Sequence, residues 1–140
     1  MRSQTEIEAA QAKLVSVKTG TVTMPDKFNS PENRFKLACF GAEMYRIVSH
    51  PGEDLDARRA LIRELLDELI AASPQAKAAL KAYRNGEEAA LPNWLVRLTA
   101  KLNVLDWARG NEDGDDFAVN LSMIEAALAR RSWQTRPHQQ

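Results

Sequence analysis

Apolar side chains recur at helical spacings of three and four residues along most of this chain, and residues that start or stop helices separate the apolar stretches. Ser30 and Ser73 each stand where a serine caps a helix. Each is followed by a proline at the first helical position, Pro31 and Pro74, where the missing N–H costs nothing. Gly86 follows an asparagine and is a typical residue at a helix end. Together the spacing and these signals predict an all-α fold.

The spacing predicts a compact bundle of five or six short helices. They are expected at residues 5–17, 31–49, 54–72, 74–84, 92–109 and 115–131. The last two carry leucine-rich faces on either side of a short loop, which is typical of an antiparallel helical hairpin at the C-terminal end. The inward side of the third helix is expected to consist of apolar residues, namely Leu55, Ile62, Leu65, Leu66, Leu69 and Ile70.

Two stretches fall outside the helical pattern. Residues 18–30 include threonines, a valine and a proline that favour an extended conformation, and we expect a long irregular loop that lies over the bundle and buries Val22 and Met24. Residues 133–140 are expected to form a flexible C-terminal tail. The chain is therefore predicted to be one helical domain over residues 1–132, with the tail outside it.

The residues needed for catalysis are sparse and badly placed. Nucleophilic catalysis usually needs a histidine base, and the two histidines are His50, in a Pro-Gly turn, and His138, near the C-terminus. Cys39, the single cysteine, lies in an apolar run and is typical of a small core residue. Glycine-rich phosphate-binding motifs do not occur in the sequence. We therefore expect a protein that is not an enzyme and that holds no cofactor.

The acidic loop at residues 111–116 has part of the pattern of a calcium-binding loop. When its glycine is aligned with the sixth loop position, Arg109 falls at the first ligand position and Asn120 at the twelfth. Both positions need carboxylates for affinity, so we expect no metal site here. Asp115 and Asp116 are instead expected to cap the last helix, where negative charge favours the positive N-terminal end.

A basic, aromatic run at the C-terminal end exceeds what a helical bundle requires. Arg130, Arg131 and Arg136 surround Trp133, and the sequence has no acidic residue after Glu125. Arginine and tryptophan are enriched in binding hot spots, and the same mixture can also grip single-stranded nucleic acid. In the alternative interpretation the arginines complement the C-terminal end of the helix dipole and the tryptophan folds back onto the core.

Acidic residues gather at the opposite end of the last predicted helix. The sequence places four of them close together: Glu112, Asp113, Asp115 and Asp116. Such charge separation along one helix suits steered docking to a charged partner, and it also suits head-to-tail self-association. Trp107 lies near the end of the fifth helix, just outside its leucine face, and is a further candidate for contact with a partner.

These features favour a non-catalytic protein-interaction module: an adaptor, an inhibitor of another protein, or a small subunit of a complex, of a kind common on mobile genetic elements. Nucleic-acid binding or a regulatory role through the basic C-terminal patch is the alternative. The chain has 19 basic and 19 acidic residues, and this balance argues against a surface that coats nucleic acid.

The expected partner is another protein, alone or within a nucleoprotein complex, and a homodimer is a further option. No apolar run approaches the roughly 20 residues that span a bilayer, so no membrane association is expected. A single cysteine suits a reducing compartment, and the N-terminal residues lack the apolar stretch of a secretory signal. We therefore expect a cytoplasmic protein.

Overall fold

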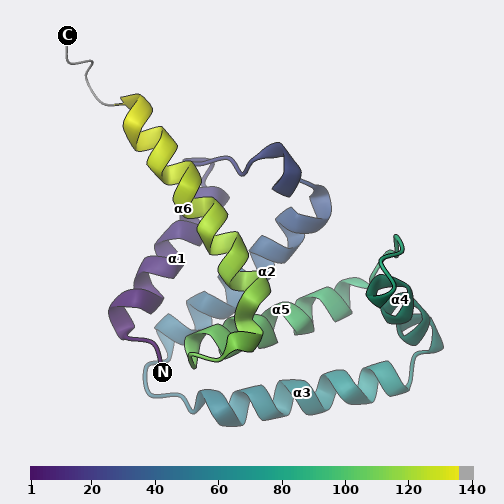
Figure 1. The fold of residues 1–140 in the computed structure, drawn as a ribbon. Coiled ribbons are helices and arrows are strands. Elements are labelled where there is room, and N and C mark those ends of the chain that lie inside the picture. The colour runs from purple at the N-terminus through teal and green to yellow at the C-terminus, as the bar shows by residue number, and fades with distance from the viewer. Residues whose placement is uncertain (136–140) are drawn as a thin grey trace.

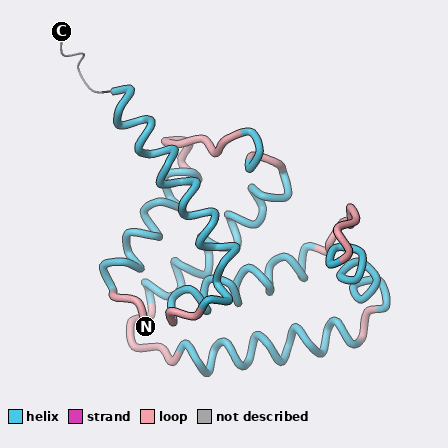
Figure 2. The backbone as a smooth tube through the Cα atoms, in the orientation of Figure 1, coloured by secondary structure: helices cyan, strands magenta, loops and turns pink. Residues whose placement is uncertain are grey.

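Six α-helices make up most of residues 1–135, the part of the chain that the computed structural model describes (Figure 1). They are α1 (Gln4–Lys18), α2 (Pro31–Ser49), α3 (Leu55–Ala71), α4 (Pro74–Arg84), α5 (Asn93–Ala108) and α6 (Asp115–Thr135). Two short 3-10 turns join them, η1 (Asp26–Phe28) and η2 (Glu112–Gly114). Figure 2 shows only helices and loops in this part of the chain. The predicted all-α fold is confirmed.

The helix starts follow from local capping. The Ser30 hydroxyl accepts a hydrogen bond from the N–H of Asn33, and the Ser73 hydroxyl accepts one from the N–H of Ala76. Each bond satisfies a donor that the first turn of a helix leaves without an intrahelical partner. The last helix continues to Thr135, beyond its predicted end, because the sequence has no glycine or proline in this stretch before Pro137.

The core is built around the C-terminal half of α5. Five consecutive residues are buried there: Val104, Leu105, Asp106, Trp107 and Ala108. Consecutive residues point in all directions around a helix, so this stretch must be surrounded by neighbours. Those neighbours are α2, α3, α6 and η2. The hydrophobic effect of burying these elements against one another supplies the main stabilisation of the fold.

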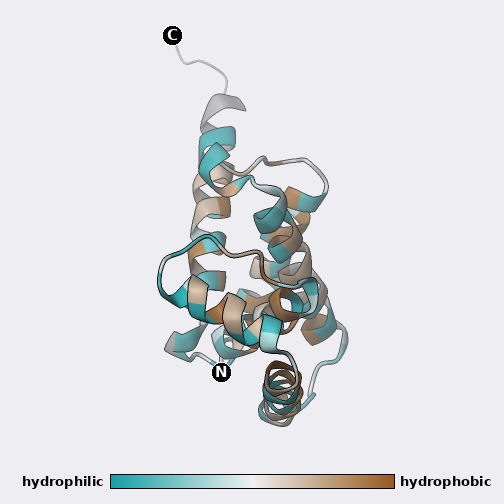
Figure 3. Cartoon of the chain, turned by 90° about the vertical axis from the view of Figure 1, so that its right-hand side faces the viewer, coloured by the Kyte–Doolittle hydropathy of each residue, from teal (hydrophilic) through white to brown (hydrophobic). Residues whose placement is uncertain are grey.

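The short turn η2 joins α5 to α6, and the two helices pack on one another. The side chain of Asn103 in α5 accepts a hydrogen bond from the N–H of Phe117 in the first turn of α6, at 2.8 Å. Figures 1 and 3 show α6 crossing α5 rather than running along it. This crossing leaves room for α2 and α3 to contact α5 as well.

Gly114 allows this turn to pack closely. A Cβ atom at Gly114 would lie 2.7 Å from the backbone nitrogen of Trp107, nearer than van der Waals contact permits. Gly114→Ala is therefore expected to lower the free energy of unfolding by about 1–3 kcal/mol, as overpacked sites do. Gly41→Ala is the matched control, because a Cβ at Gly41 in α2 meets open space and alanine favours helix by about 0.5–1 kcal/mol. Urea unfolding measures both, and equal midpoints for the two variants would contradict the close packing.

The segment between α1 and α2 lies over the core without regular structure apart from η1. Val22 and Met24 in it are buried, and Phe28 packs partly buried against the core. The buried apolar side chains hold this segment in place, because an irregular chain of this length has few backbone hydrogen bonds of its own.

Candidate functional site

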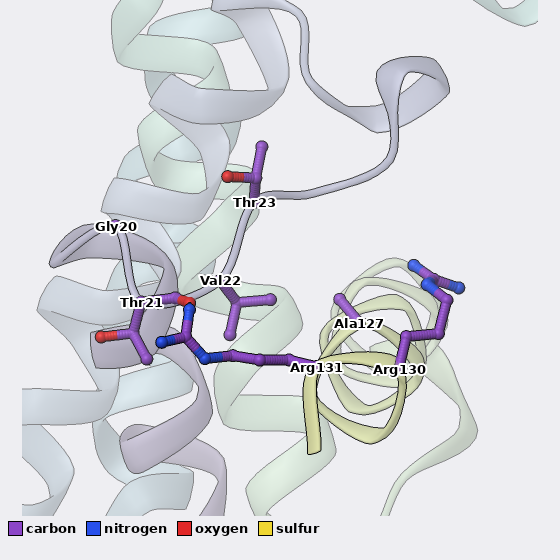
Figure 4. A pocket seen from close by; sticks show the side chains of 7 residues that line it. All are labelled: Gly20, Thr21, Val22, Thr23, Ala127, Arg130 and Arg131. Atoms are coloured by element: carbon purple, nitrogen blue, oxygen red, sulfur yellow. The ribbon is translucent and has the colours of Figure 1, made fainter. Parts of the chain in front are cut away.

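The basic residues predicted to bind a partner lie at the C-terminal end of α6. Arg130 and Arg131 are exposed and border an open groove of about 270 Å³, which the loop at residues 20–23 closes on the other side (Figure 4). The guanidinium of Arg131 donates a hydrogen bond to the carbonyl oxygen of Thr21. The side chain of Trp133 and all of Arg136 lie outside the described residues.

The acidic residues predicted to bind a partner lie at the other end of α6. Asp113, Asp115 and Asp116 are exposed, and the backbone of Glu112 belongs to η2, while its side chain lies outside the described part of the structure. Asp116 forms an ion pair at 2.9 Å with Lys36 of α2, so one of these acids also joins two helices. The structure therefore places the acidic and basic candidates at opposite ends of one helix rather than in one site (Figure 1).

Trp107 is a core residue, which corrects the expectation that it lies at an interface. Its side chain is 8% exposed and meets the ring of Phe117 edge-to-face at 5.1 Å. The guanidinium of Arg2 lies 4.3 Å from the centre of the indole, and its Nε donates a hydrogen bond to the Trp107 carbonyl oxygen. These contacts help to bury the indole, because α5 is surrounded by neighbouring elements at this position.

A row of exposed leucines lies along one side of α3. Leu61, Leu65 and Leu69 follow one another at intervals of one helical turn and are 68%, 45% and 37% exposed. We call these three residues the leucine stripe. The sequence pattern predicted that Leu65 and Leu69 face inward, and the structure shows this to be wrong.

The position of α3 explains the leucine stripe. Figures 1 and 3 place α3 at the margin of the bundle, where it packs against α5 and α4. Its core-facing residues are Leu55, Ile62 and Leu66. The apolar arc of α3 is wider than the surface that α5 and α4 cover, so the leucines on one border of that arc remain in water.

Ion pairs to two buried carboxylates hold α3 on the bundle. The guanidinium of Arg58 donates to both carboxylate oxygens of Glu43 in α2, at 2.6 and 2.7 Å, and Glu43 is buried. Arg59 donates to the buried carboxylate of Asp106 in α5 at 2.5 Å. The hydrogen bonds that Arg58 donates to Glu43 raise the pKa of Arg58 above its ordinary value. No sequence pattern identifies these pairs, because the two partners of each pair are far apart along the chain.

Acidic side chains border the leucine stripe on its outer side. Glu64 lies three residues after Leu61, and Glu68 lies three residues after Leu65, so both stand beside the stripe on the helix surface. Both are exposed, and no ion pair joins either of them to another side chain that the structure describes. The charge of Asp67, which lies further round the helix, is instead balanced by Arg63 at 3.3 Å.

The single cysteine lies in the core rather than at the surface. Cys39 is buried, and this burial raises the pKa of its thiol, so the reactive thiolate is disfavoured. The search of the described residues found no group of three or more histidine, cysteine, aspartate or glutamate side chains placed to share a metal ion. Every helix in the same part of the chain is too short or too polar to cross a bilayer.

Comparisons with known protein families, curated proteins and solved structures find no match.

Proposed function

We propose that this protein is a non-catalytic module that binds a helix of another protein through the leucine stripe on α3. The observation that carries the proposal is the exposure of Leu61, Leu65 and Leu69 in one row. A single exposed leucine is ordinary, but aligned leucines on one helix are the surface that an amphipathic partner helix recognises. Full burial of one leucine side chain is worth about 1.5–3 kcal/mol, so this row offers a substantial driving force.

The rigid setting of α3 supports the same proposal. Arg58 and Arg59 attach the helix to buried carboxylates on two other helices, and Ile62 packs in the core on the adjacent face. A partner would therefore meet a surface that is already in its final conformation. Binding to such a surface avoids the entropic cost of ordering side chains and backbone, which otherwise reduces affinity.

The alternative function is nucleic-acid binding by the basic residues at the C-terminal end of α6, and fewer observations favour it. Arg130 and Arg131 border one open groove, which is the observation in favour. Arg131 already donates to the Thr21 carbonyl, so part of its hydrogen-bonding capacity is used within the chain. Binding of a single-stranded DNA or RNA probe at about 50 mM salt, weakened steeply by added salt, would favour this alternative.

Site-specific photo-crosslinking tests the leucine stripe. A photoreactive residue at Leu65 is expected to crosslink to one helical segment of a different protein, and Leu69→Glu is expected to weaken that contact about tenfold, because an apolar anchor is replaced by a charge. The same photoreactive residue at Tyr45, which is exposed on α2, is the matched control. Equal crosslinking from both positions, or crosslinks only to a second copy of the chain, would contradict the proposal.

A further inference from the structure

We propose that the partner helix carries lysine or arginine beside its apolar face, and that these cations pair with Glu64 and Glu68 on α3. The inference rests on the proposed function, because it concerns the same leucine stripe. It adds a chemical class to the partner: an amphipathic helix with a basic border. The argument depends on the charges around the stripe, which differ between its two borders.

The outer border of the stripe is acidic and unbalanced. Glu64 and Glu68 are one helical turn apart, and like charges at this spacing disfavour a helix slightly. The ion pair between Arg63 and Asp67 lies further round α3 and leaves the two glutamates uncompensated. The fold therefore gains nothing from Glu64 and Glu68, whereas cations placed over this border would relieve their repulsion and gain charge-assisted hydrogen bonds.

The inner border of the stripe is electrically balanced. Arg58 lies on that side of the helix, three residues before Leu61, and its guanidinium is held by both carboxylate oxygens of Glu43. Arg58 is therefore already paired, whereas Glu64 and Glu68 on the outer border are not. A partner with cations along one border fits this surface in a defined orientation, because complementary charges fix register as well as affinity.

Two other occupants could come from this chain itself: α3 of a second copy, and the basic C-terminal end of α6. Neither fits the stripe. In an antiparallel two-fold pairing of α3 with α3, identical borders meet, so Glu64 and Glu68 of both copies would come together without a cation. The basic end of α6 in the same molecule lies across the bundle from α3 (Figure 1). A separate chain with basic residues remains the occupant that satisfies both the leucines and the glutamates.

The length of the stripe sets the length of the partner. Leu61 and Leu69 are eight residues apart, so the stripe extends about 12 Å along the helix axis at about 1.5 Å per residue. A partner helix of about three turns covers this distance with apolar anchors at successive turns.

Two designed helical peptides test the inference. Both carry three leucines at one-turn intervals, one with lysines and the other with glutamates along the borders. In fluorescence anisotropy with the full chain at about 50 mM salt, the lysine peptide is expected to bind about tenfold more tightly than the glutamate peptide. The double variant Glu64→Lys/Glu68→Lys is expected to reverse the preference. The control, Glu87→Lys/Glu88→Lys, makes the same change of charge in the exposed loop after α4 and should preserve it.

The outcomes separate this inference from the proposed function. If both peptides bind equally and Leu65→Glu abolishes both, the leucine stripe docks a helix but the basic border is wrong. If neither peptide binds, the proposed function fails as well. Lysine-peptide binding that survives Leu65→Glu would reflect charge alone and would overturn the inference. A dimer in sedimentation of the chain alone that Leu65→Glu dissociates would also overturn it, since the occupant is then a second copy.

Discussion

Glu43→Ala is expected to lower the free energy of unfolding by about 3–5 kcal/mol, the cost of removing one partner from a buried ion pair. Glu43 is 1% exposed, and both its oxygens accept hydrogen bonds from Arg58, at 2.6 and 2.7 Å. The variant leaves the guanidinium of Arg58, whose side chain is only 17% exposed, without its carboxylate. An exposed pair such as Arg63 with Asp67 contributes far less, because water screens it.

A double-mutant cycle measured by urea unfolding isolates the pair. Replacement of both Glu43 and Arg58 by methionine is expected to recover most of the stability lost in Glu43→Ala, because no unpaired charge then remains. Glu64→Ala serves as the surface control and should change stability by no more than about 0.5 kcal/mol. A loss below about 1 kcal/mol in Glu43→Ala would show that water reaches the pair and that it does not anchor α3.

Local signals predicted the helices well because each helix carries its own start. Ser30 with Pro31 and Ser73 with Pro74 are capping sequences, and the structure shows the serine hydroxyls accepting hydrogen bonds from the first turns. Such contacts involve residues three apart, so the sequence pattern contains all the information they need. The boundaries of α2 and α4 follow directly from them.

The candidate site was predicted less well, because it depends on contacts between distant residues. Periodicity shows that Leu65 and Leu66 both belong to the apolar arc of α3, but only the position of α5 decides that Leu66 is covered and Leu65 is not. Trp107 was misplaced for the converse reason. A single apolar face was expected on α5, whereas several elements surround it and bury every side.

The burial of two acidic residues could not be predicted from the sequence either, because it too depends on contacts between distant residues. Glu43 and Asp106 are of residue types that are almost never buried without a partner. Their partners, Arg58 and Arg59, lie on a different helix, and nothing local identifies them. The pairs fix the orientation of α3, and that orientation exposes the leucine stripe.

Phe117→Ala is expected to lower the free energy of unfolding by about 3–5 kcal/mol. The Phe117 side chain is fully buried, and its ring meets Phe40 of α2 at 5.0 Å and Trp107 of α5 at 5.1 Å, both edge-to-face. Three helices therefore meet at this ring. Its removal leaves a cavity that rigid helices cannot close, and it also removes two aromatic contacts worth about 0.5–1.5 kcal/mol each beyond their burial.

Calorimetry with two control variants tests this cavity. Phe117→Leu keeps most of the buried volume and should cost clearly less than Phe117→Ala, while Val119→Ala, at an exposed position of the same helix, should be nearly neutral. A similar loss of stability in Phe117→Leu and Phe117→Ala would show that the contacts between aromatic rings, rather than the buried volume, dominate the contribution of Phe117. Because Phe117 lies away from the stripe, folded Phe117→Ala should still bind the lysine peptide with unchanged affinity, whereas Leu65→Glu should lose binding at unchanged stability. The opposite effects of these two variants on stability and on peptide binding would separate residues that stabilise the bundle from residues of the proposed binding surface.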